Sequence, residues 1–285
     1  MSREENARYL ESIRQRGTGV PWKRWMKLWP FLLIAYAVFY FLFSGGKMPG
    51  PPSSETVRRT GSEVGSILLF VVLLTVGLMA FVFWKGRTAR RKSTVAFLHP
   101  DPSALLAVYE QVLASSNRLP DGACYLANSR AMAHVFYGDA ASARRELSRV
   151  DWAGRPPIIR AMERASEASI LMLCEDAPAQ GLPLAREALS MIDLPSPVVG
   201  SAQGRAYFEV CVSIGEVLTG TATPASLQVL EQHHEKTPLA MVRLLSAWGL
   251  RVAYTRAGDT ARAEAMRELL QREAPHCAPL HRIPG

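Results

Sequence analysis

Two long stretches of this sequence lack any charged residue, which is unusual for helices that meet water. The first lies between Lys27 and Lys47 and holds nineteen residues, and the second lies between Glu63 and Lys85 and holds twenty-one. A helix of about twenty residues is roughly 30 Å long, which matches the hydrocarbon core of a bilayer. We therefore predict two transmembrane helices, residues 28–46 and 64–84, in an integral membrane protein.

No cleavage site of the small-x-small type follows the first apolar run, which disfavours the alternative of a cleaved signal peptide. A buried hairpin of two core helices is the other alternative. Both runs are bounded by aromatic and basic residues, which favour the headgroup region of a membrane. The flanking residues that we expect there are Trp25, Lys27, Trp29, Trp84, Lys85 and Arg87.

Lysine and arginine are scarcer in the connector between the two runs than on either outer side. Five stand close before the first run, three lie in the connector, and five follow the second run. Because cytoplasmic flanks carry the excess, we expect both termini in the cytoplasm. The predicted parts are a cytoplasmic segment 1–27, an external loop 47–63 and a basic juxtamembrane linker 85–99. The expected location is a bacterial inner membrane.

The chain lacks an even spread of charge. Residues 1–92 carry fifteen Lys and Arg against five Asp and Glu, whereas residues 93–285 carry eighteen against twenty. A nucleic-acid-binding domain needs a basic surface, so we expect no nucleic acid as a partner of the second part. The basic cluster from Lys85 to Lys92 either sets the topology alone or also attracts anionic lipid of the bilayer.

Cysteine and the common catalytic motifs are also scarce. The four cysteines are far apart and form no CxxC pair, which suits buried thiols in a reducing compartment. Phosphate-loop, dinucleotide and nucleophile-elbow motifs are absent. The neighbours His233 and His234 diverge on a helix, and His276, Cys277 and His281 give only three ligands. We therefore expect no enzyme activity, no cofactor and no metal.

Alternating strand patterns are missing from about Pro100 onward, where apolar residues recur at helical spacing. The fold class that we predict is all-α, with about nine helices in roughly four antiparallel pairs. Helix starts are marked by a capping side chain directly before a proline. These predicted starts are Asp101-Pro102, Ser196-Pro197, Thr223-Pro224 and Thr237-Pro238.

Similar turns recur along this part of the chain. Gly138-Asp139 and Gly258-Asp259 are predicted tight turns, and Glu175-Asp176 and the stretch 220–224 hold the same place between them. The spacings of about 37 to 45 residues are in the range of helical-hairpin repeats. The pattern predicts a soluble α-solenoid of about four hairpins over residues 100–275. Residues 276–285, rich in proline, are expected to form a flexible tail.

The last hairpin resembles a tetratricopeptide repeat. With Pro275 at the terminal proline of that family, four other family positions match, namely Leu250, Tyr254, Gly258 and Ala263. Three positions depart from the family pattern, namely Ala247, Arg251 and Arg267. Around Gly138 the matching residues are Ala131, Ala143 and Leu147, with His134 at the tyrosine position. A different α-solenoid or a plain helical bundle is the alternative.

Stacked hairpins of this type form extended inner surfaces that bind peptides and helices. The resemblance implies that Arg130, His134, Arg251 and Tyr254 line such a surface and contact a protein partner. We therefore expect a membrane-anchored scaffold that binds another protein at the cytoplasmic face. The alternatives are a helical-bundle enzyme or metal-dependent hydrolase without a local motif, and a regulator of an oligomeric membrane complex that acts through its spans.

Overall fold

A computed structural model of the chain describes Gly77 and residues 92–113, 121–192 and 201–284. Both predicted spans, apart from Gly77, lie outside these ranges, as do the segment 1–27, the loop 47–63 and the anchor flanks Trp25, Lys27, Trp29, Trp84, Lys85 and Arg87. Among the helices in the described ranges, none is both long and apolar enough to cross a membrane. All described residues except Gly77 belong to one compact unit.

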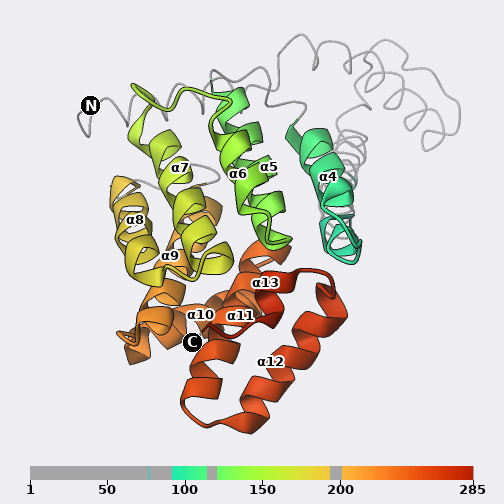
Figure 1. Cartoon of the computed structure of the whole chain (residues 1–285), viewed down its shortest axis with the longest axis vertical. Helices are drawn as coiled ribbons and strands as arrows, with labels where there is room; N and C mark the ends of the chain where they lie inside the picture. Colours follow the sequence, from blue (N-terminus) through green and yellow to red (C-terminus); the bar gives the residue numbers. More distant parts are fainter. Residues whose placement is uncertain (1–76, 78–91, 114–120, 193–200, 285) are drawn as a thin grey trace, which may run out of the picture. The chain divides into compact units, whose positions relative to one another are not determined.

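This unit is all-α, and the residues that the structure describes contain no strand. Consecutive helices pack against each other in pairs, as the sequence predicts (Figure 1). The pairs are α5 with α6, α7 with α8, α9 with α10, and α11 with α12. The bounds are α4 Ser103–Leu113, α5 Gly122–Phe136, α6 Ala140–Leu147, α7 Pro157–Ser169, α8 Pro178–Met191, α9 Ser201–Thr219, α10 Pro224–Lys236, α11 Ala240–Arg256, α12 Thr260–Glu273 and α13 Ala278–His281.

The predicted Gly-Asp turns join the helices of the first and the last pair. Gly138 and Gly258 have φ angles of 81° and 75°, which glycine adopts without the strain that a Cβ would cause. The side chains of Asp139 and Asp259 then accept the backbone N–H three residues on, at 2.8 and 3.1 Å. Each turn therefore ends one helix and caps the next, which confirms this part of the sequence prediction.

Two of the helix starts predicted from a proline, at Thr223-Pro224 and Thr237-Pro238, can be compared with the helices of the structure. Thr223 and Ser226 form a reciprocal capping box ahead of α10, with Pro224 at the first helical position, as predicted. Thr237 does not cap α11, which begins at Ala240 behind the extended residue Leu239. The backbone N–H of Thr237 donates to the carbonyl of His233, so this residue closes α10 instead. The start predicted at Ser196 lies outside the described residues.

Helix α7 continues into a π-helical segment, η2, with bounds Ile170–Cys174. Its end coincides with the predicted turn at Glu175-Asp176, where Asp176 has a φ of 53°. A π-helix widens the turn and leaves backbone carbonyls without their usual partners. The carbonyl of Leu173 at this end accepts a hydrogen bond from the side chain of Arg282, 109 residues along the chain.

Both ends of the unit differ from the predicted boundaries. Residues 92–96 of the predicted linker are helical, and Phe97 is buried against the ring of Phe136 at a centroid distance of 5.0 Å. The tail, expected to be flexible, instead contains helix α13 with Leu280 fully buried. The domain therefore begins before residue 100 and extends past residue 275, because apolar residues on both sides complete its core.

Candidate functional site

Helix α6 is shorter than the second helix of any other pair in the described ranges. It has 8 residues, whereas α8, α10 and α12 have 14, 13 and 14. In the later pairs the second helix packs on the next first helix, as α8 does on α9 and α10 on α11. Residues 148–156 form a loop where α6 would otherwise continue towards α7. This place, which we call the α6–α7 seam, holds a cavity.

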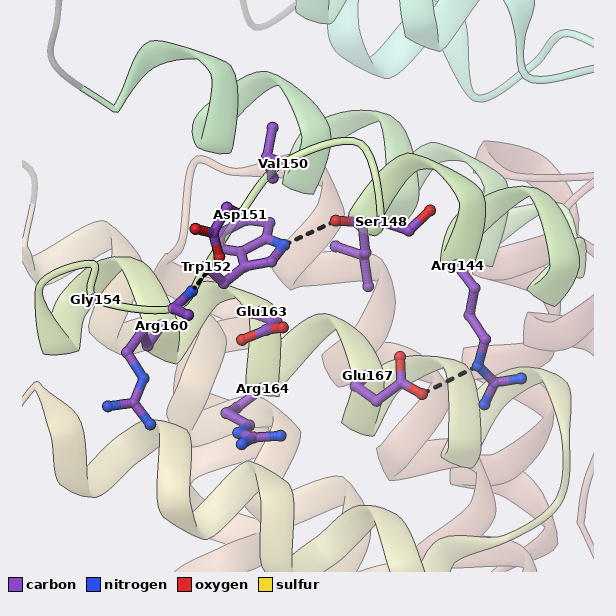
Figure 2. A pocket seen from close by; sticks show the side chains of 12 residues that line it. Arg144, Ser148, Val150, Asp151, Trp152, Gly154, Arg160, Glu163, Arg164 and Glu167 are labelled. Atoms are coloured by element: carbon purple, nitrogen blue, oxygen red, sulfur yellow. Dashed lines mark hydrogen bonds and ion pairs between the residues drawn. The ribbon is translucent and has the colours of Figure 1, made fainter.

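The cavity at the seam has a volume of about 840 Å³ (Figure 2). Its wall consists of the end of α6, the following loop, and one side of α7, as Figure 2 shows. The lining residues are Arg144, Leu147, Ser148, Val150, Asp151, Trp152, Ala153, Gly154, Arg160, Glu163, Arg164 and Glu167. The wall therefore combines apolar side chains from the end of α6 and from the loop with alternating charges on the α7 side.

The loop that bounds the seam is held by buried polar contacts. The indole N–H of Trp152 donates to the carbonyl of Leu147 at 2.8 Å, and the Trp152 side chain is 6% exposed. Arg155 donates to a carboxylate oxygen of the buried Asp121 at 2.9 Å. Because these bonds tie the loop to α6 and to the start of α5, the shape of the cavity is built into the fold.

Four residues of α7 at helical spacing form one polar stripe along the cavity, namely Arg160, Glu163, Arg164 and Glu167. At one end Glu167 accepts a hydrogen bond from Arg144 at 3.0 Å, and Arg144 is also paired with Glu175. The buried Nε atom of Arg164 lies 3.4 Å from a carboxylate oxygen of Glu187, which makes an ion pair without hydrogen-bond geometry.

Within this stripe, Arg160 and Glu163 offer a ligand one charge of each sign. Burial raises the pKa of the Glu163 carboxyl above its ordinary value, and Arg164 and Arg160 act against this shift. In Figure 2 the Glu163 carboxylate lies between Trp152 and Arg164, and Arg160 extends from the same helix. A partially dehydrated carboxylate gains more from an incoming donor than one in water does.

The predicted contact residues on α5 already have contacts within the domain. Arg130 donates to Glu110 of α4 at 2.6 Å and lies 3.9 Å from Glu146 of α6. The Nδ1 atom of His134 is buried without a hydrogen-bond partner, and a carboxylate oxygen of Asp139 lies 3.9 Å away. Both side chains are mostly covered, since they are 28% and 17% exposed.

The other two predicted contact residues lie on α11. Arg251 donates to the backbone carbonyl of Leu280 at 3.2 Å, so the chain's own C-terminal segment covers it. Tyr254 donates to Glu231 at 2.9 Å, and the guanidinium of Arg262 lies 4.5 Å from its ring centre. Burial, and then repulsion from Arg267, lowers the pKa of Arg251. The short helix α13 contacts both α5 and α11.

The described residues contain no group of three His, Cys, Asp or Glu side chains that could hold a metal ion. His233 pairs with Glu209 at 3.1 Å, and the neighbouring His234 does not join it. Cys277 is fully buried, and His281 faces the carbonyl of Ala274 at 2.8 Å. Comparison with protein-family models, curated proteins and solved structures finds no match for the chain.

Sequence reasoning missed the α6–α7 seam, although part of its signal is readable. The spacing of Arg160, Glu163, Arg164 and Glu167 marks one helix face with alternating charge. Gly154 and the two following prolines mark a loop after α6. The cavity itself depends on how far α6 continues and on where Trp152 packs, and neither is fixed by a local pattern.

Proposed function

We propose that the chain is a membrane-anchored scaffold, and that its helical pairs hold a partner protein at the α6–α7 seam. The occupant that fits the seam is an amphipathic helix of the partner. Its apolar face would meet Leu147, Val150 and Trp152, and its charges would pair with Arg160 and Glu163. This helix would take the place that a longer α6 leaves open.

The observation that carries this proposal is the polar stripe of α7 beside an apolar wall. Later first helices are covered by the second helix of the preceding pair, but this side of α7 borders a cavity of about 840 Å³. A helix with complementary charges would pair with Arg160 and Glu163, which both line the cavity. A binding surface of this kind needs no catalytic group.

The pairs themselves are proposed to be tetratricopeptide-like. The positions that carry the resemblance have the expected environments in the last pair: Leu250 is buried, Gly258 forms the turn, and Ala263 packs on the core. Tyr254 is 8% exposed. In such arrays each pair buries its apolar face against its neighbours, and the stack forms an extended surface that suits a scaffold.

The same proposal places the scaffold at the cytoplasmic face of a bacterial inner membrane, with both termini inside. Its support is the pair of uncharged runs at 28–46 and 64–84 together with the excess of basic residues on their outer sides. Anionic lipid at the basic cluster 85–92 would add attraction of about 1 kcal/mol per basic residue near the surface.

A charge reversal tests the seam in the full chain. The tagged chain is extracted in detergent and captured as unmodified protein, as R160E and as R272E. Arg272 lies on α12 and is 69% exposed, so its reversal is a matched control. We expect one co-purifying protein to be reduced at least tenfold by R160E and unchanged by R272E. Equal recovery from all three chains would refute the seam as the binding surface.

A further inference from the structure

The C-terminal segment 277–284, which we call the strap, is held largely through its backbone. The carbonyls of residues 280, 282 and 284 accept hydrogen bonds from three side chains of α11, namely Arg251, Trp248 and Arg256. The donor–acceptor distances are 3.2, 2.9 and 3.4 Å respectively. Leu280 lies in the single helical turn of α13, whereas the backbone at Arg282 is extended. Helix α11 therefore presents a row of donors suited to a peptide that leaves a helical turn in an extended conformation.

Helix ends provide a second set of contacts around the strap. Arg282 donates to the carbonyl of Leu173 at 2.7 Å, at the end of η2, and pairs with Asp176 at 3.0 Å. Arg256 donates to the last carbonyls of α9, those of residues 217 and 218, at 2.5 and 3.0 Å. Because the C-terminal end of a helix is partially negative, η2 favours a cationic side chain at this position of the peptide.

Apolar anchors fix the register of the strap. Leu280 is fully buried and Pro284 is buried, whereas Arg282 between them is exposed apart from its two polar contacts. Pro279 also approaches the turn at Gly138, 3.5 Å from where a Cβ would stand. The sequence pattern of the strap is therefore an aliphatic residue, an arginine two residues later and a proline two residues after that.

We propose that the strap is an intramolecular ligand of a peptide-binding groove formed by α5, η2 and α11. The partner that fits this groove is a protein segment with an aliphatic residue in one helical turn, followed by an extended stretch with an arginine two residues and a proline four residues after it. Such a segment competes with the strap, which covers the groove in the free chain. This surface is separate from the α6–α7 seam, and the inference does not depend on the function proposed there.

The test uses the full chain and a variant that cannot seat its own strap. Leu280→Asp places a charge where the fold provides a dry site, which expels the strap. The probe is a fluorescein-labelled peptide with residues 276–285 in reducing buffer, followed by fluorescence anisotropy. The control probe is the same peptide carrying Leu280→Asp. Helicity is followed by circular dichroism for both chains.

We expect the L280D chain to stay helical and to bind the natural peptide at least tenfold more tightly than the unmodified chain does. The reason is that a tethered strap acts at an effective concentration on the order of mM, which a free peptide must overcome. Adding Arg251→Met to the L280D chain should weaken binding again. An unfolded L280D chain that peptide does not restore, or a folded one that ignores the peptide, would overturn the proposal.

Discussion

At the scale of single residues, close helix contacts in this domain depend on glycine. In Gly215 of α9, an added Cβ would lie 2.9 Å from the Leu182 Cδ1 atom and 3.3 Å from its backbone Cα. Contacts this short require the backbones of α8 and α9 to separate. Gly204 of the same helix is different, because its nearest neighbour would be a ring carbon of Phe208 at 3.9 Å.

Gly215→Ala should therefore lower the free energy of unfolding by about 1–3 kcal/mol, as overpacked cores do. Gly204→Ala should raise it by up to about 1 kcal/mol, since alanine is the better helix former where space allows. Thermal unfolding of the full chain in detergent, followed by circular dichroism, measures both. Opposite signs for the two variants are the result that this account requires.

The buried thiols predict a loss of stability at high pH. Burial raises the pKa of Cys174 and of Cys211 to about 11, and the pKa of Cys277 to about 12. An unfolded thiol has a pKa of about 8.5, so the unfolded chain releases protons that the folded chain keeps. The free energy of unfolding should thus be constant below about pH 8.5 and should decrease from there towards pH 11.

Cys211→Ala provides the control for this prediction. The variant lacks one of the shifted thiols, so its stability should decrease less steeply between pH 8.5 and 11 than that of the unmodified chain. Unfolding midpoints at pH 7, 9, 10 and 11 measure the slope. Identical slopes would show that this thiol is already exposed in the folded chain.

Sequence reasoning worked best for residues whose role is local. The turns at Gly138-Asp139 and Gly258-Asp259 and the cap at Thr223 follow from neighbours within three positions, and the structure has them. Arg251 and Tyr254 were named as contact residues from the repeat resemblance, but their contacts come from positions 29 and 23 residues away. Such separations are set by tertiary packing, which a single sequence does not show.

At the scale of elements, the short helix α6 determines the shape of the seam. A helix of 8 residues is too short to be stable by itself, so its cap matters more than usual. The cap is the bond from the Ser142 backbone N–H to Asp139 at 2.8 Å. Its loss would loosen the start of α6, and the other end of this short helix forms one wall of the cavity.

Asp139→Ala should lower the free energy of unfolding by about 1 kcal/mol. Asp139→Asn should keep most of the stability of the unmodified chain, because asparagine caps helices as well. Thermal unfolding of the three full chains in detergent gives the ranking. Equal losses from both substitutions would mean that the charge of Asp139, and not its cap, supports α6.

Element boundaries could be predicted at the two Gly-Asp turns and at the Thr223-Pro224 start, whereas Thr237-Pro238 proved to end α10 and not to begin α11. The π-helical end of α7 could not, because η2 is stabilised by contacts with α5, α6, α8 and α13 and by Arg282 from the far end of the sequence. The strap was expected to be flexible because of its prolines. Its order comes from donors on α11, which its own composition does not reveal.

At the scale of the whole molecule, the charge distribution predicts the topology. Reporter enzymes that work only outside the cytoplasm should be active when fused within the external loop, after Ser54, and inactive when fused after residue 285. A reporter that fluoresces only in the cytoplasm should give the opposite pattern. Activity of the outside reporter at residue 285 would place the helical pairs on the other side of the membrane.

The central claim is that a partner protein occupies the α6–α7 seam while the chain is in its membrane. Site-specific photo-crosslinking in living cells tests it most directly, with a photoreactive amino acid in place of Arg160 and, as control, in place of Arg272. We predict one adduct of defined mass from position 160 and none from position 272. No adduct from position 160, or the same adducts from both positions, would contradict the account.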